Sequence, residues 1–155
     1  FYRGFSKLAE LRFKGSAHLE NAIIKCPNPG SNNGLTVIIS DFMTDSNWKK
    51  AVDYLLFQKR QIMLIQVLSP EEADPAYTGR MRLVDLEADD PLDERHMKLK
   101  ITRSHLKAYR QALDDFRADI KSFCASREVD FISVVSDEPI EKLLFERMYK
   151  TGTIK

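Results

Sequence analysis

The amino-acid sequence predicts an α/β fold in which helices cover both faces of a mainly parallel sheet. Three short apolar runs have the length and β-branched content of buried strands, namely Leu35–Ser40, Gln61–Leu68 and Phe131–Val135. Stretches with helical spacing of apolar residues separate them. One further section alternates apolar and polar residues, as a β-hairpin does. Strands that alternate with helices are typical of parallel sheets, because parallel neighbours need a crossover connection.

Length and composition are those of one domain. The chain has 155 residues, of which 43% are hydrophobic, and a chain of this size buries roughly 69% of its unfolded surface. We therefore expect a single domain over residues 1–155. The first residue is Phe1 rather than Met, so we expect this domain to be a piece of a longer protein.

Charge, hydropathy and cysteine content exclude several classes of partner. The formal net charge of +1 provides no concentrated positive field, so we expect no nucleic-acid binding. The longest uncharged apolar run, Leu35–Ser40, is far shorter than the ~20 residues that span a bilayer, so we expect no membrane contact within this segment. Cys26 and Cys124 lack partners at ligand spacing, which favours reduced thiols and a cytoplasmic segment. The sequence leaves open whether a longer parent protein is membrane-anchored.

The first part of the chain predicts two short helices, a loop and the first strand. Apolar residues between Phe5 and Phe13 indicate one short helix, and Leu19–Ile23 indicates a second. Pro27–Gly34 consists of turn-forming residues and is expected to be an exposed loop. Leu35–Ser40 has apolar residues on both faces, which favours a strand buried on both sides.

The middle of the chain predicts a helix, the second strand and the hairpin. Asp45 or Ser46 can cap a helix whose apolar residues share one face, namely Trp48, Val52, Leu55 and Leu56. Gln61–Leu68 is the second buried strand. Gly79–Glu87 and His96–Thr102 have a period of two, which favours a two-stranded hairpin with one face in solvent.

The last part predicts a long helix, the third strand and a final helix. Ser104–Ser126 is expected to pack on the sheet through apolar residues spaced by three and four, namely Leu106, Tyr109, Leu113, Phe116, Ile120 and Phe123. Phe131–Val135 is the third strand. Asp137 or Glu138, followed by Pro139, favours the start of a last helix. Its inward residues are expected to be Ile140, Leu143, Leu144 and Met148.

Asp41 is the position with the clearest chemical potential, because it directly follows the first strand. Open α/β sheets bind their ligands at the carboxyl ends of strands. A haloacid-dehalogenase nucleophile needs a second Asp where Met43 stands, and a Walker-B carboxylate needs a phosphate loop that the sequence lacks. Two interpretations stay open. Asp41 contributes to a magnesium site, or it caps the following loop by accepting backbone N–H bonds.

Other catalytic signatures are absent from the sequence. It contains no GxxxxGK[ST] phosphate loop, no GxGxxG turn, no HExxH zinc motif and no GxSxG elbow. The histidines His18, His96 and His105 lie apart from one another and from the cysteines, so we expect no zinc site. These absences favour a protein that is not an enzyme.

Short motifs along the chain resemble those of a known family. Gly15–Ile23 followed by Val37–Phe42 is similar to the second half of a von Willebrand factor A domain. Four motifs in order resemble the bacterial domain-of-unknown-function 58 family, which is associated with MoxR-type AAA+ ATPases: Ser40–Phe42, Val67–Glu72, Leu83–Glu87 and Val135–Pro139. The resemblance implies a Rossmann-like, von Willebrand factor A-like three-layer sandwich with a β-hairpin insertion, lacking the family's first strands.

The resemblance also implies a metal-ion-dependent adhesion site around Asp41. Such a site needs a DxSxS stretch, which this sequence lacks, and a Thr whose position falls on Ala17, beside Ser16. We therefore expect a degenerate or incomplete site, in which Asp41 and Ser16 hold Mg²⁺ at most weakly. No tightly bound cofactor is expected.

Two functions from different classes follow. The resemblance implies a non-catalytic protein-interaction module that binds a MoxR-type AAA+ ATPase, with Asp41, Phe42, Asp45 and His18 at the docking surface. The alternative is a divalent-metal-dependent hydrolase that uses Asp41, with Asp45 and Ser16 as further ligands.

Absence of the family's first strands would also leave one edge of Leu35–Ser40 without a neighbour. An open apolar edge invites pairing with another chain. We therefore expect either a homodimer through this edge or its coverage by the N-terminal helices.

Overall fold

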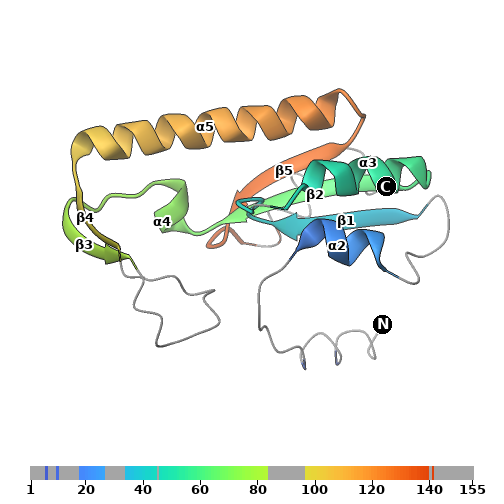
Figure 1. The fold of residues 1–155 in the computed structure, drawn as a ribbon, viewed down its shortest axis with the longest axis horizontal. Helices are drawn as coiled ribbons and strands as arrows, with labels where there is room; N and C mark the ends of the chain where they lie inside the picture. Colours follow the sequence, from blue (N-terminus) through green and yellow to red (C-terminus); the bar gives the residue numbers. More distant parts are fainter. Residues whose placement is uncertain are drawn as a thin grey trace.

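The structure, a computed structural model, describes residues 6, 10, 18–26, 34–44, 46–83, 97–139 and 141. These residues form a parallel sheet, a separate hairpin and helices around them (Figure 1). In chain order the elements are α2 (Leu19–Ile24), β1 (Leu35–Ser40), α3 (Trp48–Phe57), β2 (Gln61–Leu68), α4 (Pro70–Ala73), β3 (Gly79–Leu83), β4 (Met97–Ile101), α5 (Arg103–Ala125) and β5 (Asp130–Val135). The predicted α/β class with a mainly parallel sheet is confirmed.

The parallel sheet has the strand order β1-β2-β5 among the described residues. Ile38 of β1 pairs with Leu64 of β2, which pairs with Phe131 of β5, so these three side chains point to the same face. α3 connects β1 to β2, whereas the connection from β2 to β5 passes through α4, the β3-β4 hairpin and α5 (Figure 1). The arrangement is Rossmann-like, with all three carboxyl strand ends at one edge.

α3 and α5 cover that face and build the main core. It consists of Ile38, Phe42, Trp48, Val52, Leu55, Ile62, Leu64, Ile120, Cys124 and Val129. α2 lies against α3, where Leu19 and Ile23 extend the core and the Lys50 Nζ lies 2.8 Å from a Glu20 carboxylate oxygen. Burial raises the pKa of the Cys124 thiol to about 11, although Arg127 and Lys49 oppose the shift. This cysteine is therefore a protonated core residue at neutral pH.

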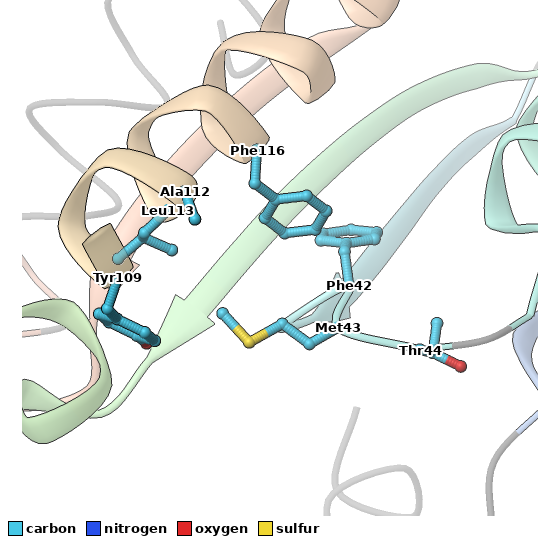
Figure 2. A pocket seen from close by; sticks show the side chains of 7 residues that line it. All are labelled: Phe42, Met43, Thr44, Tyr109, Ala112, Leu113 and Phe116. Carbon is cyan, nitrogen blue, oxygen red and sulfur yellow. The ribbon is translucent and has the colours of Figure 1, made fainter. Parts of the chain in front are cut away.

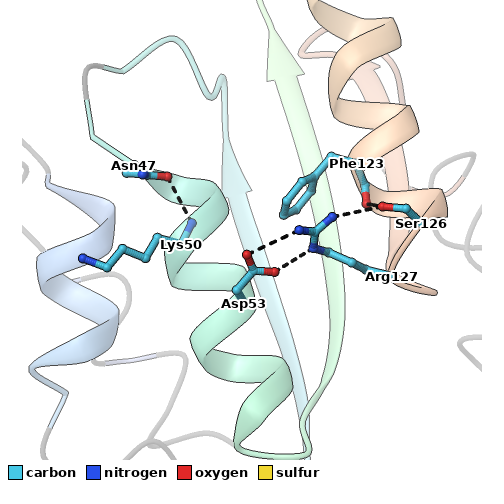
Figure 3. A network of polar contacts seen from close by, with 6 residues as sticks. All are labelled: Asn47, Lys50, Asp53, Phe123, Ser126 and Arg127. Atoms are coloured by element: carbon cyan, nitrogen blue, oxygen red, sulfur yellow. Dashed lines mark hydrogen bonds and ion pairs between the residues drawn. The ribbon is translucent and has the colours of Figure 1, made fainter.

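An arginine ties the end of α5 to α3 (Figure 3). Arg127 Nε donates to Asp53 Oδ1 at 2.6 Å, and a second guanidinium nitrogen donates to Asp53 Oδ2 at 3.4 Å. The guanidinium carbon also lies 3.9 Å from the centre of the Phe123 ring. Planar two-point binding of a carboxylate with stacking on an aromatic ring suits Arg and not Lys. The contact fixes where the C-terminal half of α5 lies over the sheet.

β1 corrects one prediction, because it is buried on one face only. Ile38 is buried, but Leu35, Val37 and Ile39 on the opposite face are exposed, Ile39 to 66%. The strand has apolar residues on both faces, as the central β2 does. It lies at the end of the sheet among the described residues, however, and α3 and α5 cover its other face. Apolar composition alone therefore overstated its burial.

The opposite face of the sheet is buried at β2 and β5, through Met63, Ile65, Ile132 and Val134. The sequence predicts helices on both faces of the sheet, and two of the predicted helices are the one between Phe5 and Phe13 and the one after Pro139. Nearly all of both segments lies outside the described residues. The three-layer arrangement therefore stays a prediction on this side.

The hairpin and the long helix are where the sequence predicts them. β3 and β4 pair antiparallel, with Met81 opposite Leu99, while residues 84–96 of the predicted hairpin lie outside the described residues. α5 begins one residue earlier than predicted, after Thr102, whose hydroxyl accepts the His105 backbone N–H at 3.3 Å. No helix in the described part of the chain has both the length and the apolar character to cross a bilayer.

The outer edge of β1 has unused backbone groups in the described part of the chain. The Gly34 carbonyl faces β2, where it accepts the Gln61 N–H. Backbone groups alternate sides along a strand, so those of Val37 and Ile39 point away from β2. On this side Arg60 donates to the carbonyl of Leu35 at 3.3 Å. Because β1 carries no charged residue, two copies could pair there without like-charge repulsion.

We predict that Ile39→Lys weakens self-association of the 155-residue chain by about tenfold or more, because the two charges would lie close across a paired edge. The Ile39 side chain is largely exposed, so the fold should survive the change. Analytical ultracentrifugation of both proteins measures the dissociation constant. Phe57→Lys, at a residue 82% exposed on α3, is the matched control and should leave it unchanged. A parent protein that stays monomeric at all concentrations would contradict pairing through β1.

Candidate functional site

The carboxyl end of β1 is held in a tight turn by its own side chains. The Ser40 hydroxyl accepts the Phe42 backbone N–H at 3.0 Å, and Asp41 Oδ1 accepts the Met43 N–H at 2.9 Å. Ser40 Oγ also donates to Asp41 Oδ1 at 3.4 Å. Short polar side chains of this kind supply the hydrogen bonds that a strand loses where its ladder stops. They direct the chain out of the sheet immediately after β1.

A buried glutamine connects this turn to the other two strands. Gln66 lies in β2 with no exposed surface. Its Nε2 donates to the Asp41 carbonyl at 3.1 Å, and its Oε1 accepts the Ser133 hydroxyl of β5 at 3.0 Å. A buried amide is stable only when such bonds are made, because an unpaired polar group there costs about 1–3 kcal/mol. The three strand ends are thereby linked by side chains as well as by the ladder.

Phe42 adopts a backbone conformation that is unfavourable for its residue type. Its φ of 62° lies in the left-handed region, which costs a non-glycine residue about 1–2 kcal/mol. Its side chain is 1% exposed, and the ring centre lies 5.2 Å from that of Trp48. Burial of an aromatic side chain stabilises by about 1.5–3 kcal/mol, which offsets the strain. The turn therefore places Phe42 inside and its neighbour Met43 outside.

The predicted site residues differ in how far the structure describes them. Asp41 is half-buried and caps the turn, as one of its two interpretations predicted. His18 is exposed just before α2, and its side chain makes no cap hydrogen bond. Ser16, Ala17 and Asp45 lie outside the described residues, so the magnesium interpretation stays untested. Within the described ranges, no three His, Cys, Asp or Glu side chains are grouped so that they could hold a metal ion.

A hollow lies between this turn and α5, and we call it the edge hollow (Figure 2). Its volume is about 340 Å³, and its lining is Phe42, Met43, Thr44, Tyr109, Ala112, Leu113 and Phe116. Figure 2 shows Phe42 and Met43 facing the α5 side chains across the hollow. Met43 is 45% exposed. The hollow is apolar and open, at the edge of the sheet where α/β proteins bind ligands.

Tyr109 and Phe116, which the sequence predicts to pack on the sheet, both line this hollow; Phe116 also packs against the main core, whereas Tyr109 is exposed. Ala112 lies between them on the same side of α5, whereas Leu113 belongs to the buried stripe. The sequence contains a sign of this arrangement, because the apolar stripe of α5 is wider than packing on the core requires. At 100° per residue, Tyr109 and Phe116 lie about 60–80° away from Leu106 around the helix. This displacement places Tyr109 and Phe116 beside the buried stripe, while Leu113 belongs both to the stripe and to the lining of the hollow.

The Tyr109 hydroxyl is held in a structural contact and donates to the Glu72 carbonyl at 2.8 Å. Burial raises the pKa of Tyr109, the Glu72 charge raises it further, and Arg117 opposes the shift. The phenol therefore keeps its proton at neutral pH. It connects α5 to the segment that follows β2, at the end of the edge hollow.

Comparisons with known proteins identify a family. A family model described as "Protein of unknown function DUF58" matches residues 7–115. No curated protein and no solved structure matches the chain. The matched residues include β1, β2, the turn with Asp41 and the first half of α5. The edge hollow thus lies almost entirely within the matched segment.

We predict that Phe42→Gly is more stable than Phe42→Ala by about 1 kcal/mol, although glycine usually destabilises a folded chain relative to alanine. Both changes remove the buried ring, which should cost about 3–5 kcal/mol. Only glycine relieves the positive φ. Urea unfolding measures the difference. Phe116, inside α5, is the control: there the glycine variant should be less stable than the alanine variant, as is usual in a helix. A glycine variant that is less stable than the alanine variant at Phe42 as well would contradict the strain argument.

Proposed function

The chain belongs to the DUF58 family of proteins of unknown function, and from this premise we propose that it is a non-catalytic protein-interaction module. Its candidate partner is a MoxR-type AAA+ ATPase, which the resemblance of the motifs suggests. We place this interaction in the cytoplasm, without a role for nucleic acid or for membrane contact within this segment. The proposal includes a von Willebrand factor A-like domain whose metal-ion-dependent adhesion site is degenerate.

The observation that carries this proposal is the edge hollow with Met43 beside it. Met43 is 45% exposed and lies next to an open apolar hollow. Contiguous apolar surface of this kind is unfavourable in water and commonly marks an interaction site. Met43 and Phe116 can contact an apolar side chain of the partner within the hollow, and the buried ring of Phe42 supports its floor. Asp41, at the adjacent turn, supplies a carboxylate at the rim. Asp45 and His18 complete the docking surface in this proposal.

The roles of the reactive groups also favour docking over catalysis. Asp41 Oδ1 is occupied by the Met43 N–H, and the Tyr109 hydroxyl is occupied by the Glu72 carbonyl. The Cys124 thiol is buried and protonated. Nucleophilic catalysis needs a group that is accessible and activated by a neighbouring base. These three groups instead stabilise the fold.

The alternative proposal is a divalent-metal-dependent hydrolase that uses Asp41. One observation favours it, because Asp41 lies at the carboxyl edge of the sheet, where α/β enzymes place their ligands. Its second carboxylate oxygen would be a ligand for Mg²⁺, with Asp45 and Ser16 as further ligands. One or two carboxylates and several waters satisfy Mg²⁺, so weak binding of this ion is part of both proposals.

For docking, we predict that Met43→Glu in the full-length protein weakens binding of a purified MoxR-type ATPase by about tenfold or more, because a charge replaces an apolar anchor. Phe57→Glu is the matched control, since Phe57 is 82% exposed and lies at the other end of α3, away from the hollow. It should change the affinity by less than about twofold. Surface plasmon resonance measures both. Equal losses in the two variants, or no binding by the parent protein, would count against this surface.

For metal binding, we predict that calorimetric titration with Mg²⁺ or Mn²⁺ gives no micromolar affinity, because the sequence lacks a DxSxS stretch and no metal-binding group of acidic, His or Cys side chains occurs among the described residues. Micromolar binding that Asp41→Ala abolishes would favour the hydrolase instead. Asp41→Asn is the control for folding, because its amide oxygen can still accept the Met43 N–H. Loss of binding in both variants would identify the carboxylate, and not the turn, as the ligand.

A further inference from the structure

A second hollow lies on the other side of Tyr109, and we call it the hairpin hollow. α4, β4 and the first turns of α5 surround it, and its volume is about 540 Å³. Its lining is Glu71, Glu72, Pro75, Leu99, Ile101, His105, Leu106 and Tyr109. Small-molecule sites in proteins have volumes of about 300–1,000 Å³ and are mostly apolar with a few polar groups. The hairpin hollow has this size and this character.

The apolar part of the hairpin hollow comes from β4 and α5. Leu99 and Ile101 lie two residues apart on β4, so they point to the same face, and Lys100 between them points to the other. Leu106 is buried beneath α5, whereas Leu99 is exposed. The exposed side chains of Leu99 and Tyr109, beside Ile101, leave apolar surface that a ligand can cover.

The charged groups around the hairpin hollow are mainly negative. Glu71 and Glu72 both line it, and Glu72 is fixed because its Oε2 accepts the Ser69 N–H at 2.7 Å. Asp74 is nearby in the chain, but Arg110 pairs with it at 2.8 Å and so offsets its charge. No lysine or arginine is among the residues that line this hollow in the described part of the chain.

Among the basic residues of α5, Arg110 donates to the carbonyl of the lining residue Pro75 at 3.3 Å, in addition to its pairing with Asp74. His105 is held at the start of α5, where its Nδ1 accepts the Thr102 N–H at 3.4 Å. At 100° per residue, Arg103 and Lys107 lie on the far side of α5 from Tyr109. The hairpin hollow is therefore an apolar site with two carboxylates, those of Glu71 and Glu72, and no Lys or Arg among its described lining residues.

We propose that the hairpin hollow binds a hydrophobic amine, a small molecule with an apolar body and an ammonium group. The apolar body lies against Leu99, Ile101 and Leu106, and the ammonium group lies at Glu71 and Glu72. A hydrophobic acid of the same shape is disfavoured, because its carboxylate would meet two like charges in a partly desolvated place. This site is separate from the edge hollow except for Tyr109, so neither proposal depends on the other.

The proposal is tested with three probes of matched shape: 4-phenylbutylamine, 4-phenyl-1-butanol and 4-phenylbutyric acid. Methyl NMR titration of the full chain should show shifts at Leu99, Ile101 and Leu106 with the amine. We expect the amine to bind about three- to tenfold more tightly than the alcohol, and the acid to bind most weakly. Salt at about 0.5 M should reduce the difference between amine and alcohol, because it screens the charges.

Two variants test whether the carboxylates cause the preference for the amine over the alcohol. Glu71→Gln should remove most of the advantage of the amine while leaving alcohol binding unchanged. Asp114→Asn is the matched control, because it removes one negative charge on the far side of α5, and it should alter neither. Glu72 is left intact, since its carboxylate also caps α4. Equal affinity for amine and acid, shifts confined to another surface, or no binding of any probe would each overturn the proposal.

Discussion

The geometry of the carboxyl edge depends on the two hydrogen bonds of the Gln66 side chain. The amide joins the carbonyl of Asp41 to the hydroxyl of Ser133, and so spans β1, β2 and β5 within the sheet. Because the Asp41 carbonyl is fixed in this way, the chain turns sharply, Phe42 takes its positive φ and Met43 is exposed. Together with the side-chain hydrogen bonds of Ser40 and Asp41 and the buried ring of Phe42, this bridge fixes the wall of the edge hollow.

The sequence was sufficient to predict most of the described elements, because each has a strong local signal. The apolar runs of β1, β2 and β5 and the stripe of α5 are such signals, and a one-residue difference at the start of α5 is within the usual fraying of a helix end. Burial of β1 could not be predicted from the same signal. Leu35, Val37 and Ile39 are as apolar as the residues of β2, but burial depends on the neighbours that the fold provides.

For the candidate site, the sequence predicted the position of Asp41 and offered capping as one of its two roles. The partners that decide between roles come from other strands and helices. Gln66 bonds to Asp41, 25 positions before it, and to Ser133, 67 positions after it. No local sequence pattern predicts such contacts. Tyr109 and Phe116 carry the same helical spacing whether they lie beneath α5 or beside it. Their place in the edge hollow depends on how α5 packs against the sheet and against the turn after β1.

The composition of β1 has a consequence for handling the protein. Its six residues are mostly β-branched, carry no charge and contain no proline or glycine, and such segments are prone to stack into cross-β fibrils. Natural edge strands commonly carry a lysine, a proline or a bulge that prevents this. β1 has none of these safeguards, so preparations at high concentration or high temperature should be watched for amyloid-like precipitation that begins at this strand.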